Sequence, residues 1–192
     1  MATADQVTDG SRGTDRSAEE RRRGPGRRDW GTWPSYEQAV LGYRDYWYPV
    51  AWSRKVRESE PLPVTVCGER VMLVREQGVV RALHDRCPHR GVPLSHELNG
   101  REFPGTWTCG YHGWTFDLAD GRLVAAITDG PESPICGKVA VRTYPVAERV
   151  GIVWVFIGDG APPDVSADIP SELLASDAVI RGRLTVRPGN WR

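Results

Sequence analysis

The sequence predicts a mainly β domain built from antiparallel strands, as a sandwich or a small barrel. Short apolar runs recur along residues 64–157, and turn signals containing glycine separate them. The longest apolar run, Gly151–Ile157, has the length of a strand and falls well short of the roughly 20 residues that span a bilayer. No internal repeat occurs. We therefore expect one β-rich domain with its own core.

A disordered tail and two helical segments are expected outside the strands. Residues 1–29 are rich in Asp, Ser, Gly, Thr and Arg, with almost no large apolar side chains, and predict a disordered tail. Ser35 and Gln38 form a capping box that predicts a short helix. Its apolar positions at turn-like spacing are Tyr36, Val40, Tyr43 and Trp47. Residues 169–174 predict a single helix near the end.

The strands follow in order between these helices. Gly78 and the pair Asp120-Gly121 predict turns between neighbouring strands. The expected strands are Val64–Cys67, Val71–Val74, Val79–Leu83, Thr106–Thr108, Gly113–Asp117, Lys138–Tyr144 and Val150–Ile157.

Charge excludes several classes of partner. The 25 Lys and Arg residues balance 25 Asp and Glu residues, so no overall field favours nucleic acid or a membrane. Arginines at 21–23 and 27–28 make the tail basic, but no apolar segment of a signal peptide follows them. The aromatic residues are not interleaved with a basic stripe, as a surface that stacks nucleic acid bases requires. We expect neither a nucleic acid nor a membrane as partner.

Two short motifs carry the chemistry. Residues 87–91 (CPHRG) have the spacing C-x-H, and residues 109–114 (CGYHGW) have the spacing C-x-x-H. Such mixed pairs fit a Rieske [2Fe–2S] centre, in which two histidines replace two cysteines on one of the two irons. Cys87 and Cys109 would hold one iron as thiolates, with His89 and His112 on the other. Each loop must then reach both irons, so neither builds the site alone.

Structural zinc is the alternative for two cysteines and two histidines. Zinc fingers usually pair cysteine with cysteine and histidine with histidine along the sequence, at spacings that this chain lacks. Two further cysteines, Cys67 and Cys136, have no partner spacing, and Cys67 is expected as a small buried residue in a strand. His84 and His96 are expected as exposed polar residues near a strand end and on a loop.

At these motifs the chain resembles a known family. Residues 85–95 (DRCPHRGVPLS) and 111–116 (YHGWTF) are similar to the Rieske domain in the α-subunits of non-haem iron aromatic-ring-hydroxylating oxygenases, of the carbazole 1,9a-dioxygenase type. Residues 46–51 (YWYPVA) resemble the start of that domain, and residues 150–158 and 189–192 resemble its end. The 19 residues from Arg90 to Thr108 slightly exceed the family's spacing, which we interpret as an enlarged surface turn around residues 98–102.

The resemblance implies a domain plan and a function. A Rieske-type antiparallel β-sandwich, with a small cluster-binding subdomain and its short N-terminal helix, would occupy residues 30–160, and residues 161–192 would form a linker and the start of a truncated catalytic domain. The domain would pass single electrons to a mononuclear iron outside this chain, so the 192 residues are expected to be an oxidoreductase component without oxygenase turnover. A ferredoxin or flavin reductase would be the donor, and the full-length protein would form a homotrimer.

Some readings stay open from sequence alone. A stand-alone Rieske-type ferredoxin is the alternative function, and a protein-binding fragment without the cluster is a third. Trp114 either shields the cluster, as its family position suggests, or belongs only to the core. Val92 and Tyr111 stand where high-potential Rieske proteins carry a disulfide, and this favours a potential near the low end, about −150 mV. Thiolate ligands and the lack of a signal peptide favour a cytoplasmic location.

Overall fold

The computed structural model describes residues 42–100, 103–130, 132–183 and 185. These residues contain nine strands, arranged in three antiparallel sheets of three strands each. The first sheet has the order β1 (Tyr46–Trp52), β9 (Ile152–Ile157), β8 (Val146–Arg149). The second has the order β2 (Leu62–Val66), β3 (Glu69–Glu76), β4 (Val79–His84). The third has the order β5 (Thr106–Cys109), β6 (Trp114–Asp117), β7 (Leu123–Ala126).

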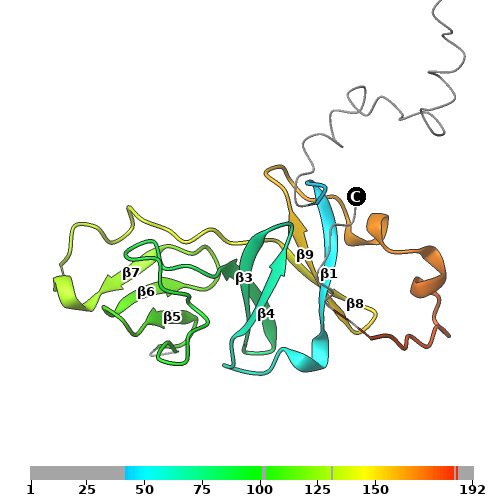
Figure 1. Cartoon of the computed structure of the whole chain (residues 1–192), viewed down its shortest axis with the longest axis horizontal. Coiled ribbons are helices and arrows are strands. Elements are labelled where there is room, and N and C mark those ends of the chain that lie inside the picture. The colour runs from blue at the N-terminus through cyan, green and yellow to red at the C-terminus, as the bar shows by residue number, and fades with distance from the viewer. Residues whose placement is uncertain (1–41, 101–102, 131, 184, 186–192) are drawn as a thin grey trace, which may run out of the picture. The chain divides into compact units, whose positions relative to one another are not determined.

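The second sheet is buried on both faces because the side chains of β3 alternate between two cores. Val71 and Leu73 pack with residues of β1, β8 and β9 in one core. Met72 and Val74 pack with residues of β5, β6 and β7 in the other. Alternation along a strand sends neighbouring side chains to opposite faces. This is why residues 71–74 read as a continuous apolar run, and why β3 and β4 lie between the other two sheets (Figure 1).

Three two-residue turns connect neighbouring strands. In each turn both residues have a positive φ, namely 49° and 74° at Cys67-Gly68, 52° and 77° at Gln77-Gly78, and 52° and 74° at Val150-Gly151. This pattern is typical of type I′ hairpins, in which both central residues have a positive φ, and glycine occupies the second position in all three turns. Cys67 was therefore expected wrongly in a strand: it is half-buried in the turn between β2 and β3.

The strand predictions are largely confirmed, with one exception. The first three expected runs fall in β2, β3 and β4, the next two in β5 and β6, and the last in β9. Asp120-Gly121 lies between β6 and β7, as the turn signal predicts. Residues 138–144 were predicted wrongly as a strand. They form only isolated bridges, Arg122 with Ala140 and Leu83 with Thr143, because no neighbouring segment extends a continuous ladder along them.

Neither predicted helix is found as an α-helix among the described residues. Trp47 is not helical: it lies in β1, pairs with Phe156 of β9 and is 8% exposed, because pairing with β9 buries its large side chain. Tyr43, which also belongs to that predicted helix, is not helical either. The part from Ser35 to Leu41 lies outside the described residues, as do the predicted tail at 1–29 and the motif at 189–192. The segment at 169–174 forms a 3₁₀ turn at Ser171–Leu174, preceded by Pro170, instead of an α-helix.

No helix among the described residues is long and apolar enough to cross a membrane.

Candidate functional site

The two sequence motifs form loops at the ends of strands. Cys87 follows the end of β4, whereas Cys109 is the last residue of β5 and pairs with Trp114, the first residue of β6. His112 therefore lies in the connection between two adjacent strands. Strand pairing fixes both ends of this second loop, so the position of His112 follows from the β5–β6 hairpin.

Both loops close with the same backbone hydrogen bond. The N–H of Gly91 donates to the carbonyl of Cys87 at 2.8 Å, and the N–H of Gly113 donates to the carbonyl of Cys109 at 2.8 Å. The two glycines have φ values of 78° and 66°, which side chains with a Cβ rarely adopt. Each loop thus turns back within five residues and presents its histidine at the bend.

The two cysteines meet in the interior. Cys87 and Cys109 are each 2% exposed and belong to the core that β5, β6 and β7 share with β3. A hydrogen bond from the Cys87 thiol lowers the pKa of Cys109 to about 6, against the opposing effect of burial. The backbone N–H groups of Tyr111 and His112 favour the Cys109 thiolate further. The thiolate is the form in which cysteine binds metals.

The Cys87 side chain is instead favoured in its protonated form, as a thiol. Its pKa is raised, first because it donates to Cys109 and then because it is buried, while the backbone N–H groups of His89 and Arg90 oppose the shift. Each sulfur therefore faces two backbone donors of its own loop, besides the other sulfur. Such backbone donors would stabilise both cysteines as thiolates when the two sulfurs bind a metal ion.

The two histidines lie beside each other on the outer side of the thiols. The ring centroids of His89 and His112 are 4.6 Å apart, with the planes at 66°. The indole of Trp114 stacks on His89, at 4.5 Å between centroids and 6° between planes. Both histidines are half-buried and both cysteines are buried, so the arrangement has an inner sulfur side and an outer nitrogen side.

This arrangement fits a two-iron cluster. The indole Nε1 of Trp114 is buried and has no hydrogen-bond partner within the described part of the chain, and such a donor suits a group that carries acceptor sulfur. Among the described residues, no three or more His, Cys, Asp or Glu side chains converge as the ligands of one metal ion would. Ligands divided between two irons need no such single point, whereas a tetrahedral zinc site does.

The first loop is also fixed at its base by a buried carboxylate. Asp85 is 1% exposed and accepts hydrogen bonds from the backbone N–H of Ser95 at 2.7 Å and from its hydroxyl at 2.8 Å. Arg70 donates to the same carboxylate at 3.2 Å. Asp85 and Ser95 are the first and last residues of the motif at 85–95, but neither was predicted as a site residue. Their positions at the two ends of the segment 85–95 could have indicated that they close the loop.

The remaining histidines and cysteines are not part of this group, although Cys136 packs against the core that contains the two thiols. His84 is half-buried at the end of β4, where its Nδ1 lies 3.3 Å from the hydroxyl of Tyr144. The exposure predicted for His84 is therefore wrong, because Tyr144 packs over the strand end. His96 is exposed on a loop, as predicted. Cys67 and Cys136 are free and half-buried, and neither belongs to the thiol pair.

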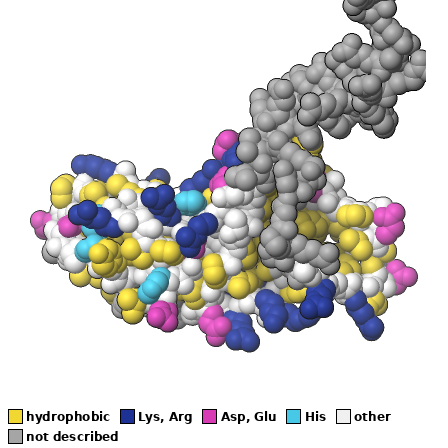
Figure 2. Space-filling model, viewed as in Figure 1, with side chains coloured by type: hydrophobic (Ala, Val, Ile, Leu, Met, Phe, Trp, Pro, Cys, Tyr) yellow, Lys and Arg dark blue, Asp and Glu magenta, His cyan; other side chains and the backbone are white. Residues whose placement is uncertain are grey.

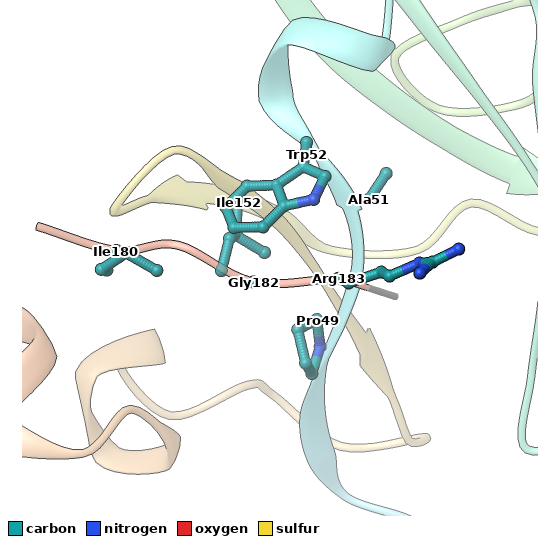
Figure 3. Close-up of a pocket in the computed structure, with 7 residues that line it drawn as sticks. All are labelled: Pro49, Ala51, Trp52, Ile152, Ile180, Gly182 and Arg183. Atoms are coloured by element: carbon teal, nitrogen blue, oxygen red, sulfur yellow. The ribbon is translucent and has the colours of Figure 1, made fainter. Parts of the chain in front are cut away.

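Large apolar side chains are exposed near the second loop. The most exposed are Leu98 at 72%, Tyr111 at 61%, Ile127 at 59% and Phe103 at 58%. Figure 2 shows apolar, basic and histidine side chains close together over the end that carries β5, β6 and β7. A separate apolar pocket of about 200 Å³ lies where the segment at 180–183 passes β1 and β9, lined by Trp52 and Ile152 among others (Figure 3). None of the predicted site residues lines it.

Comparison with known proteins places these loops in a family. The model of the Rieske [2Fe-2S] domain matches residues 46–145. The carbazole 1,9a-dioxygenase terminal oxygenase component CarAa of Sphingomonas sp is 41% identical over 160 residues, which cover 83% of this chain and 42% of that protein. The chain thus spans about two fifths of the length of the curated relatives it matches.

Solved structures give the same result. The terminal oxygenase of carbazole 1,9a-dioxygenase from Nocardioides aromaticivorans IC177 matches with a TM-score of 0.72 and 45% identity, over 77% of this chain and 40% of that chain. The reduced complex between oxygenase and ferredoxin in carbazole 1,9a-dioxygenase matches with a TM-score of 0.71 and 39% identity, over 77% of this chain and 37% of that chain. At these identities the likeness extends beyond the fold to the sequence of the domain.

Proposed function

Since this chain belongs to the Rieske [2Fe-2S] domain family, we propose that Cys87 and Cys109 bind one iron of the cluster and that His89 and His112 bind the other. The observation that carries this assignment is the coupled, buried thiol pair on two loops whose half-buried imidazoles contact each other. The cluster supplies reversible uptake of a single electron.

The protein side chains would divide the work around this group. The buried cysteines exclude water from the sulfur side. Trp114 would orient the ring of His89 by stacking, and its buried Nε1–H has no partner among the described residues, which favours the shielding role over a purely structural one. The outer position of His89 and His112 makes their edges the shortest path for an electron to a docked protein.

At the level of the whole protein, we propose the electron-transfer domain of an aromatic-ring-hydroxylating oxygenase terminal component. Similarity to the carbazole 1,9a-dioxygenase terminal oxygenases supports this. The electron would pass to a mononuclear non-haem iron that these 192 residues do not bind. The match to an oxygenase–ferredoxin complex supports a ferredoxin as donor, with a flavin reductase as the alternative donor. We also propose a homotrimer for the full-length protein, which only the family resemblance implies.

We also propose a low reduction potential, about −150 mV, and a cytoplasmic location. Val92 and Tyr111 cannot form the disulfide that joins the ligand loops of high-potential Rieske proteins. Both remaining cysteines are free thiols, which suits a reducing compartment.

The test is the metal content and redox behaviour of the chain purified without oxygen. We expect about two irons and two acid-labile sulfides per chain and a Rieske-type electron paramagnetic resonance (EPR) signal after reduction. A ferredoxin with its reductase should then reduce the centre, and mild oxidation should restore it. One zinc per chain without labile sulfide would contradict the proposal, and so would a chain that folds without any metal.

A further inference from the structure

The segment Leu98–Gly100 connects the two ligand loops instead of forming a free surface turn. The sequence predicted only an enlarged surface turn around residues 98–102, because the 19 residues from Arg90 to Thr108 slightly exceed the family's spacing. In the structure this segment lies against the second loop. The backbones of Gly100 and Thr108 exchange two hydrogen bonds, at 3.1 Å and 2.7 Å, just before Cys109.

The side chain of Asn99 contacts both loops at once. Its Nδ2 donates to the carbonyls of Pro93, at 2.7 Å, and Leu94, at 3.0 Å, which lie at the far end of the first loop. Its Oδ1 accepts from the backbone N–H of Gly110, at 2.6 Å, in the second loop. Gly110 lies directly between Cys109 and Tyr111, so this bond holds the backbone of the C-x-x-H motif itself.

Close backbone packing supports the same contact independently. A Cβ added to Gly110 would overlap the carbonyl oxygen of Leu98. Gly110 has no unusual φ, so glycine is required there by the approach of residue 98 and not by the backbone conformation. The segment and the second loop therefore fit together only without a side chain at position 110.

We propose that Asn99 is a positioning residue that sets the spacing between the two ligand loops, and thereby the retention and electronic environment of the centre they hold. Each loop supplies one cysteine and one histidine, so a change in their spacing moves one ligand of each iron relative to the other. The Asn99 side chain hydrogen-bonds three backbone groups, two in the first loop and one in the second. These three bonds are enough to link the two loops. The inference rests on the ligand assignment proposed above.

Asn99→Ala tests this in the full chain carrying its centre. We expect release of iron to a chelator to become about tenfold faster, since loss of outer-shell support typically weakens metal affinity by about 10- to 100-fold. The EPR g-values of the reduced centre should also shift, a readout that general destabilisation of the fold would leave unchanged. Glu97→Ala is the matched control, since Glu97 is an exposed neighbour on the same segment. It should behave like the wild type in both measurements.

Asn99→Asp keeps the shape and the acceptor for the Gly110 N–H but loses the donors to residues 93 and 94. We expect it to lie between wild type and Asn99→Ala in release rate. If Asn99→Ala does not fold, Asn99→Asp decides. Wild-type g-values and release rate in whichever variant folds would overturn the proposal, and so would failure of both to fold, because Asn99 would then be a general folding residue.

A second pair of variants tests the contact without touching Asn99. Gly110→Ala should speed iron release and shift the g-values in the same way, because its Cβ displaces the segment from the loop. Gly100→Ala is the control, since a Cβ there meets no atom of the described residues within 4 Å. Equal behaviour of the two alanine variants would overturn the proposal. A wild-type chain that lacks iron and sulfide would instead overturn the ligand assignment, so the two failures are distinguishable.

Discussion

The body of the domain and its cluster-binding end are held together by different interactions. The core between β3 and the sheet of β1, β9 and β8 is mainly aliphatic, with Leu73, Val155 and Ile157 fully buried. At the other end the core contains two thiols and three large aromatic rings, and polar side chains fix the loops above it. Apolar burial is non-directional, whereas hydrogen bonds fix positions. Fold stability and site geometry should therefore respond to different substitutions.

The largest effect is expected when a ligand is removed. Cys109→Ser should abolish the Rieske signal and reduce iron to background, because a hydroxyl does not replace a thiolate on iron. The aliphatic core contains no ligand, so the far-ultraviolet circular dichroism of the sheets should persist. Cys136→Ser is the control, as Cys136 lies outside the thiol pair, and should keep the signal. Iron retained by Cys109→Ser would contradict the site.

Leu73→Ala tests the aliphatic core, and it should change fold stability without changing the site. Leu73 is fully buried in the aliphatic core, so its truncation should lower the free energy of unfolding by about 3 kcal/mol. The g-values of the folded fraction should stay at the wild-type values, because neither ligand loop touches this core. Urea unfolding and EPR on the same preparation check both statements. A shifted EPR spectrum would show that the two regions are coupled.

Asp85→Ala should affect both regions, and less strongly. It removes two hydrogen bonds from Ser95 to a buried carboxylate, and we expect about 2 kcal/mol lower stability together with faster iron release. Arg70→Ala separates the ion pair from these bonds. Arg70 is largely exposed, so this variant should lose less than about 1 kcal/mol. Equal losses in the two variants would assign the effect to the ion pair instead of the loop.

The smallest expected effect is the loss of stability at acid pH, which depends on Glu69 in the body of the domain. Burial raises the pKa of Glu69, but hydrogen bonds from Tyr144 and Arg44 and the charge of Arg142 outweigh it, so the net pKa is lowered below 4.5. A lowered folded-state pKa contributes stability above the unfolded value, which is lost as pH falls through the folded value. Stability should therefore decline below about pH 4.5.

Tyr144→Phe should lower stability at neutral pH by about 1 kcal/mol and make the acid decline smaller, because the pKa of Glu69 moves back toward its unfolded value. Urea titrations at several pH values measure both quantities. Tyr46→Phe, at a side chain 51% exposed, is the control. An unchanged acid decline in Tyr144→Phe would show that this hydrogen bond does not set the pKa of Glu69.

The same contrast explains what the sequence could predict. The C-x-H and C-x-x-H spacings identify ligand loops because few chemistries need that pattern, and the alternating or continuous apolar runs identify most strands. β1 was missed because Trp47 also fits a helical spacing, and only its pairing with Phe156 decides between the two. Asn99 was missed because its partners are backbone groups at positions 93, 94 and 110, which no local pattern reveals.

The proposed site divides one two-iron centre between two loops, with both histidines on one iron. Pulsed EPR on the reduced chain, prepared with isotopically labelled histidine nitrogen, tests this most directly. We expect two strongly coupled imidazole nitrogens, with loss of the Rieske signal in His89→Ala and in His112→Ala and unchanged couplings in His84→Ala and His96→Ala. A reduced centre without histidine nitrogen coupling, or one whose couplings depend on His84 or His96, would contradict it.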